Sequence, residues 1–176
     1  MPRCVAFLRA VNVGGRTVKM ELLRSAFEAL TLGRVETFIA SGNVVFDTRA
    51  RNLPALERKI EAQLLKCFGF EIDTFVRTLD EVTLIAAHPS FSDTANTQVV
   101  GFLRSAPDAP ALRTLKEMAT NVDQLRVQGR ELVWLSDKLQ SESTFSNAAF
   151  ERALKMRSTF RSVSTLRKLA AKHQES

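Results

Sequence analysis

The 176-residue sequence contains no tyrosine, one tryptophan, two cysteines and two histidines. Cys4 and Cys67 lie far apart, outside any C-x-x-C motif, and each falls in an apolar segment, so we expect both thiols to be buried. His88 and His173 have no partner at positions i+2 to i+4. The ligand spacing typical of a zinc site is therefore missing, and we predict neither a metal nor a cofactor.

Long apolar runs are also missing. No stretch approaches the roughly 20 apolar residues that a membrane-spanning helix requires. The apolar run behind Arg3 has neither the h-region nor the cleavage site of a signal peptide. We therefore expect a cytoplasmic location and no membrane partner. With 45% hydrophobic residues, the chain can bury one sizeable core or two compact subdomains without disulfides.

The order of the segments that are present predicts one strand-helix-hairpin-helix-strand unit within the first 78 residues. The expected elements are a strand at 4–12, a helix at 19–30, a hairpin of 35–40 and 43–48, a helix at 53–68 and a strand at 70–78. This βαββαβ order is that of a ferredoxin-like unit. After a short connecting helix and a loop, the same series begins again near residue 98, and a last helix begins near Thr165.

A short sequence repeat accompanies the repeated order. VAFLRA (5–10) recurs as VGFLRS (100–105), identical at four of six positions. SGNVVF (41–46) resembles QGRELVW (128–134), so we expect Phe46 to have a position in the first unit similar to that of Trp134 in the second. We predict an α+β fold with two tandem ferredoxin-like (βαββαβ) subdomains related by internal duplication, plus a C-terminal helix. The expected domains are residues 1–90 and 91–176. The alternative is that strand sequences resemble each other through shared β-propensity.

Two motifs resemble a known family. R-A-V-N-V-G-G (9–15), followed by Lys19-Met20, and S-G-N-V-V-F-D (41–47) are similar to segments of the domain-of-unknown-function 1697 family, and the resemblance continues through FGFEIDTFVRT, HPSF and GRELVWL to the C-terminus. The family is bacterial and has no established activity. The resemblance therefore implies an architecture and leaves the function unknown.

The sequence departs from the family pattern in two places. Residues 143–147 read S-T-F-S-N, without the lysine of many relatives, and residues 161–169 lack their Asn-Trp pair. This difference argues against a role of the second half in binding a flat ring.

The predicted topology brings the two family motifs together at one edge of the first sheet. If the third strand lies antiparallel beside the first, the end of one strand meets the start of the other, and the first helix begins nearby. The expected site for a small anion or phosphate-containing ligand consists of Arg9, Asn12, Gly14, Gly15, Lys19, Ser41, Gly42 and Asn43. In the alternative interpretation, Asn12 and Asn43 close turns and the glycines supply positive φ angles.

Arginines occupy equivalent places in both repeats. Arg9 and Arg104 are expected inside central strands, where each would line an open surface or pair with Asp47 or Glu131. No recognisable catalytic constellation accompanies them, because Ser41 does not stand in a G-x-S-x-G motif. An uncharacterised enzyme with scattered residues is one alternative function.

A basic C-terminal segment offers the other alternative. Residues 151–172 carry seven lysines and arginines against one glutamate, whereas the first 150 residues are nearly balanced in charge. Weak nucleic-acid binding through Arg157, Arg161, Arg167 and Lys168, all expected to be exposed, would use this excess. A solvated helix face that aids solubility is the simpler explanation. The sequence does not predict the oligomeric state.

Overall fold

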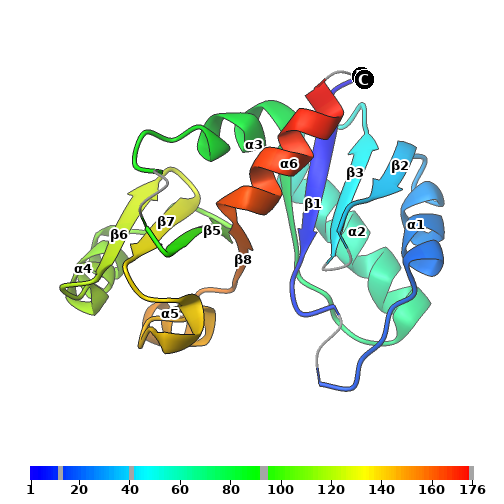
Figure 1. Ribbon diagram of the computed structural model, residues 1–176. Coiled ribbons are helices and arrows are strands. Elements are labelled where there is room, and N and C mark those ends of the chain that lie inside the picture. Colours follow the sequence, from blue (N-terminus) through cyan, green and yellow to red (C-terminus); the bar gives the residue numbers. More distant parts are fainter. Residues whose placement is uncertain (12–13, 40–41, 92–94, 175–176) are drawn as a thin grey trace. The chain divides into compact units, whose positions relative to one another are not determined.

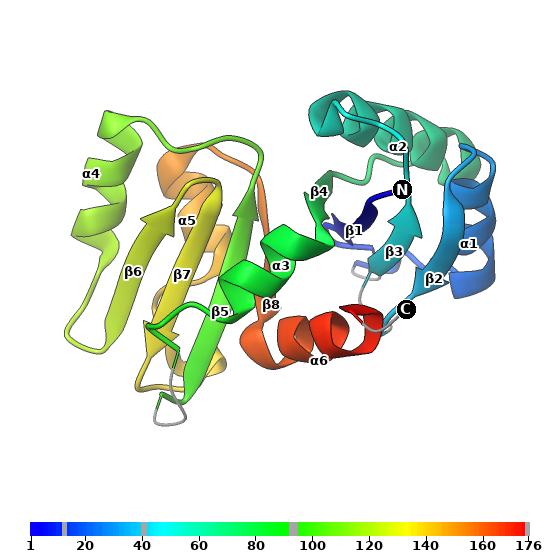
Figure 2. The same ribbon diagram turned by 90° about the horizontal axis from the view of Figure 1, so that it is seen from above.

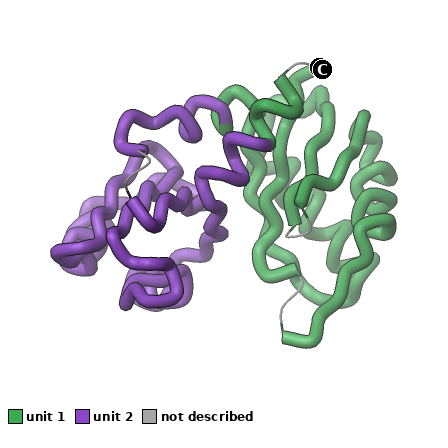
Figure 3. The backbone as a smooth tube through the Cα atoms, viewed as in Figure 1, with its two compact units in different colours: residues 1–82, 169–176 green, residues 83–168 purple. Residues whose placement is uncertain are grey.

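The computed structural model describes residues 1–11, 14–39, 42–91 and 95–174 (Figure 1). This part of the chain has an α+β fold with two four-stranded antiparallel sheets and six α-helices. The chain divides into two compact units, residues 1–82 with 169–176 and residues 83–168 (Figure 3).

Unit 1 contains the sheet with strand order β2-β3-β1-β4. Its elements are β1 (Arg3–Leu8), α1 (Met20–Glu28), β2 (Gly33–Thr37), β3 (Asn43–Asp47), α2 (Leu53–Phe68) and β4 (Thr74–Thr78). β3 lies between β1 and β2 and is antiparallel to both, as the sequence predicted. The helix α3 (Leu79–Ala86) follows β4, and the unit boundary falls within it.

Both faces of β1 are buried. Cys4, Ala6 and Leu8 belong to a core that α1 and α2 complete, and these two helices lie on the same side of the sheet (Figure 2). Val5 and Phe7, on the other face, are equally inaccessible to solvent. A strand buried on both faces reads as a continuous apolar run, which is the pattern that the sequence displays.

Unit 2 contains the sheet with strand order β6-β7-β5-β8. Its elements are β5 (Thr97–Leu103), α4 (Ala109–Met118), β6 (Asp123–Gln128), β7 (Glu131–Ser136), a 3-10 helix (Gln140–Glu142), α5 (Asn147–Leu154), β8 (Ser158–Ser162) and the start of α6 (Val163–Gln174). Trp134 lies at the centre of its core, with the ring of Phe145 at 4.9 Å between centroids. α4 and α5 contribute Leu115 and Phe150 to the same core.

The strand registers of the two units place several residues at equivalent positions. Phe46 pairs with Cys4, and Trp134 pairs with Val99; Cys4 and Val99 each stand immediately before the motif VAFLRA or VGFLRS. Both aromatic side chains are fully buried in the core beneath the helices. Phe46 in unit 1 and Trp134 in unit 2 are thus each a buried aromatic residue of the strand that pairs with the first strand of its unit.

Two arginines of the outer strands are equivalent in the same way. Arg77 of β4 pairs with Val5, and Arg161 of β8 pairs with Val100. In each case Nη1 donates a hydrogen bond to the carbonyl of the preceding residue, at 3.0 Å in β4 and 2.9 Å in β8.

Residues 169–176 belong to unit 1, although the sequence had suggested that the second unit extends to the C-terminus. The reason lies in the last turns of α6. His173 lies against Arg3 of β1, and the Lys172 ammonium lies 5.4 Å from the ring centroid of Phe38.

One expected burial is wrong. Cys4 is buried, but Cys67 is exposed, because the buried stripe of α2 runs through Leu56, Ile60 and Leu64 and passes beside it.

Candidate functional site

The end of β1 and the start of β3 are in contact, as the predicted edge site requires. The Leu8 N–H donates a 2.8 Å hydrogen bond to the carbonyl of Gly42. A Cβ atom on Gly42 would lie 3.0 Å from Val11 Cγ2 and 3.1 Å from Leu8 Cβ, and its φ angle is 83°. Only glycine fits this close approach without displacement. Asn12 and Ser41, which were also assigned to the site, lie outside the described residues.

Asn43 has a structural role at this edge. Its side-chain amide donates a 3.0 Å hydrogen bond to the carbonyl of Phe38, and the residue is 1% exposed. The bond closes the turn between β2 and β3. This is the role that the turn interpretation assigned to Asn43.

Gly14 and Gly15 form an open loop. Their φ angles are 63° and 79°, both residues are exposed, and an added Cβ would meet no described atom within 4 Å. Here the backbone conformation, and not a close approach, favours glycine. Lys19, also exposed, precedes α1 without forming a side-chain cap. Sequence reasoning missed Arg16, whose guanidinium lies 4.8 Å above the ring of Phe70 and adds a cation beside the glycines.

The two repeated arginines lie just past their strands. β1 ends at Leu8 and β5 at Leu103, so Arg9 and Arg104 each follow a strand and are half-buried. The predicted partner of Arg9 is wrong: Asp47 pairs with Arg3 in the register, at the opposite end of β1.

Asp47 instead accepts hydrogen bonds from two other arginines. Arg3 donates at 3.0 Å and Arg34 at 2.5 Å. Burial acts to raise the pKa of Asp47, but the hydrogen bonds and charges of Arg34 and Arg3 outweigh it and hold the pKa below its usual value. This cluster ties β1, β2 and β3 together at one end of the sheet.

The basic C-terminal segment divides into exposed and buried cations. Arg157, Arg167 and Lys168 are exposed, as expected. Arg161 is only 8% exposed and donates to Thr159 Oγ1 at 2.7 Å, so the prediction that it faces solvent is wrong. Burial lowers its pKa to about 10. A nucleic-acid surface built on these four residues therefore loses one of them.

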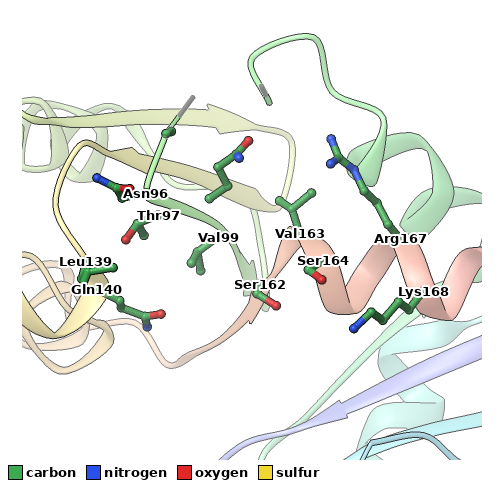
Figure 4. A pocket seen from close by; sticks show the side chains of 12 residues that line it. Asn96, Thr97, Val99, Leu139, Gln140, Ser162, Val163, Ser164, Arg167 and Lys168 are labelled. Atoms are coloured by element: carbon green, nitrogen blue, oxygen red, sulfur yellow. The ribbon is translucent and has the colours of Figure 1, made fainter. Parts of the chain in front are cut away.

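A cavity of about 520 Å³ lies in unit 2 beside the first turns of α6 (Figure 4). Its polar lining comes from the start of β5, the segment after β7 and α6: Asn96, Thr97, Gln98, Gln140, Ser162, Ser164, Arg167 and Lys168. None of the described lining residues is acidic, and none is aromatic. Sequence reasoning found only its two cations, because the amides and hydroxyls come from short segments without a motif.

The helix α6 supplies the cationic wall of this cavity. Ser162 caps the helix, since its Oγ accepts the Thr165 N–H at 3.2 Å. Ser164 and Lys168 are four residues apart and therefore share one helix face. Within the described residues, neither Arg167 nor Lys168 forms an ion pair. Positive charge thus lines a cavity to which the described residues contribute no carboxylate.

The cluster around Asp123 is structural. Its carboxylate accepts hydrogen bonds from Trp134 Nε1 at 3.0 Å, Ser143 Oγ at 2.9 Å and Thr120 Oγ1 at 2.8 Å. Burial acts to raise the pKa of Asp123, but these bonds outweigh it and lower the pKa. The residue therefore anchors the segment before α5. Among the described residues, no group of three metal-ligating side chains comes together.

Fold and cavity together define an α+β protein of two sheets with a cationic cavity in its second unit. The chain belongs to the family described as Protein of unknown function (DUF1697), whose model matches residues 1–133. The match ends within β7, before both segments that depart from the family pattern and before α6. It therefore includes the β5 wall of the cavity and not the cationic wall.

Comparison with solved structures supports the fold. The chain is similar to the conserved bacterial protein SP0830 from Streptococcus pneumoniae, with a TM-score of 0.76 and 21% identity over 99% of each chain. At this identity the likeness concerns the fold alone. The comparison with curated proteins gives no match. No helix in the described ranges has the length and apolar character needed to cross a membrane; the cytoplasmic location stays a prediction.

Proposed function

We propose that this protein binds a small anionic ligand of the phosphate class in the cavity beside α6. The observation that carries the proposal is the pair of exposed cations, Arg167 and Lys168. Within the described residues, the cavity that they line has no acidic side chain and neither cation forms an ion pair. An anion there would receive charge-assisted hydrogen bonds, which are stronger than those between neutral groups. The Ser164 hydroxyl, on the same helix face as Lys168, adds a donor.

The first test is a thermal melt with inorganic phosphate, followed by calorimetric titration. Binding to the folded state at about 100 times the dissociation constant should raise Tm by roughly 5 to 10 °C. Lys168→Gln should weaken binding about tenfold, because one charge-assisted contact is lost. Lys116→Gln, an exposed lysine on α4 that does not line the cavity, is the matched control. Equal affinities in all three proteins would refute the proposal.

The glycine edge of unit 1 is a second candidate for the same ligand class. Arg9, Gly42 and Asn43 stay in that candidate site with the Gly14-Gly15 loop, and Arg16, held over Phe70, is the observation that favours it. A variant with both Arg16→Gln and Lys19→Gln tests the edge separately, since both side chains are exposed. If the cavity is the binding site, this variant keeps the phosphate-induced rise in Tm. If the phosphate-induced rise in Tm is lost in this double variant and retained in Lys168→Gln, the anion binds at the glycine edge.

We further propose that the two units are ferredoxin-like subdomains that arose by internal duplication of one βαββαβ unit. The equal strand orders, the corresponding registers of Phe46 and Trp134 and the equivalent arginines Arg77 and Arg161 support this origin. The cavity occurs in the unit that contains Arg167 and Lys168. Under this proposal, a site in one unit has been elaborated on a duplicated scaffold.

A further inference from the structure

The two walls of the cavity differ in the hydrogen bonds they can make. The α6 wall offers cations and the Ser164 hydroxyl. At the start of β5, the side-chain donors of Thr97 and Asn96 are already engaged in hydrogen bonds within the protein. Thr97 Oγ1 donates to the Lys138 carbonyl at 2.7 Å, and Asn96 Nδ2 donates to the Asp137 carbonyl. A hydroxyl has one proton, so Thr97 can only accept from a ligand.

The Asn96 side chain has a similar bias. Its amide orientation follows from the partner, because a backbone carbonyl requires the nitrogen and not the oxygen. The side-chain oxygen is thereby left as an acceptor. Thr97 is 4% exposed, so its acceptor position is fixed by the surrounding fold. Gln140 also lines the cavity and can accept or donate.

We propose that the ligand of this cavity is a phosphorylated polyol, with its phosphate at Ser164, Arg167 and Lys168 and its hydroxyl groups donating to Thr97 and Asn96. This inference rests on the proposed anion-binding function and adds the chemistry of the rest of the ligand. A polyol monoester satisfies both walls, because its alcohol hydroxyls supply donors for the acceptor wall in addition to the phosphate that the cations bind. The described lining has no aromatic side chain on which a nucleobase would stack, and a volume of about 520 Å³ accommodates a small phosphate ester.

Two phosphate monoesters separate this inference from simple anion binding. Methyl phosphate carries the ester and no hydroxyl groups, and glucose 6-phosphate carries the same ester with a polyol. By titration calorimetry we expect glucose 6-phosphate to bind about tenfold more tightly, the effect of two ordinary hydrogen bonds. Glucose alone should not bind measurably, because it lacks the charge that the α6 wall attracts.

Variants of the acceptor wall assign the difference to its residues. Thr97→Val removes the acceptor at nearly constant volume, and Thr97→Ser retains it as the matched control. Asn96→Ala tests the exposed member of the pair and keeps the experiment decisive if the buried Thr97→Val variant does not fold. Thr97→Val and Asn96→Ala should each lower the affinity for glucose 6-phosphate several-fold and leave the affinity for methyl phosphate unchanged.

The outcomes distinguish the two proposals. The inference is supported if wild type binds glucose 6-phosphate more tightly than methyl phosphate and this difference in affinity disappears in Thr97→Val or Asn96→Ala. Equal affinities of wild type for both esters would overturn it while the anion-binding function stands. Failure of inorganic phosphate and both esters to bind would overturn the function itself and the inference with it.

Discussion

His173 is buried beside Arg3, with 3.4 Å between His173 Nδ1 and Arg3 Nη2. A guanidinium can only donate, so this contact requires an unprotonated Nδ1 and a neutral ring. Glu36 Oε2 lies 3.8 Å away and favours protonation, while Arg34 and Lys172 oppose it. Burial, followed by the charge of Arg3, lowers the pKa of His173 below its ordinary value.

This lowered pKa makes folding sensitive to mild acid. The unfolded chain binds a proton near the ordinary histidine pKa of about 6.5, whereas the folded chain binds it only at lower pH. The free energy of unfolding should therefore fall as pH drops below about 6.5 and level off below the folded pKa, with a slope of at most about 1.4 kcal/mol per pH unit. Urea denaturation between pH 7 and pH 5 measures this slope.

The second histidine supplies the control. His88 lies in the loop after α3, so His88→Gln should retain the slope, and His173→Gln should remove it. An identical pH dependence in the two variants would show that other groups cause the acid sensitivity.

At the scale of elements, apolar periodicity predicts the strands and helices because it reports local burial. It fails for Arg161. Four of the five residues of β8 are buried or half-buried, so no alternation of buried and exposed residues marks a solvent-facing side of the strand. An arginine in such a strand buries its stem and bonds its guanidinium to nearby acceptors, here Thr159 and Phe160. Charge counting along the sequence cannot distinguish this residue from the exposed Arg157.

Partners across strands need the register, which the sequence does not display. Asp47 lies opposite Arg3 and at the other end of the strand from Arg9, although both arginines flank the same apolar run. The edge between β1 and β3 was predictable because topology alone places it. The cavity was not, because Asn96, Gln140 and Ser164 come from three separate segments and match no motif.

At the scale of the whole molecule, chain order and compact unit do not coincide. Residues 169–176 follow all of unit 2 in sequence and belong to unit 1. Leu169 and Ala170 are buried, and His173 lies against Arg3. A boundary placed near residue 90 on sequence alone therefore separates residues 1–82 from residues 169–176 of the same unit.

Cutting the chain after residue 90 tests this dependence. Fragment 1–90 keeps β1 to β4 with α1 and α2, so we expect it to retain a mixed α/β circular dichroism spectrum. It lacks residues 169–176, which leaves the Arg3 and Phe38 side chains without their contacts from α6, and its urea midpoint should be lower than that of the whole chain. Adding a synthetic peptide of residues 163–176 should raise the midpoint by binding the folded fragment. The same peptide with Leu169→Asp, which places a charge where the native side chain is fully buried, should have no effect. If fragment 1–90 is as resistant to urea as the whole chain, or both peptides act alike, the end of α6 contributes nothing to the stability of unit 1.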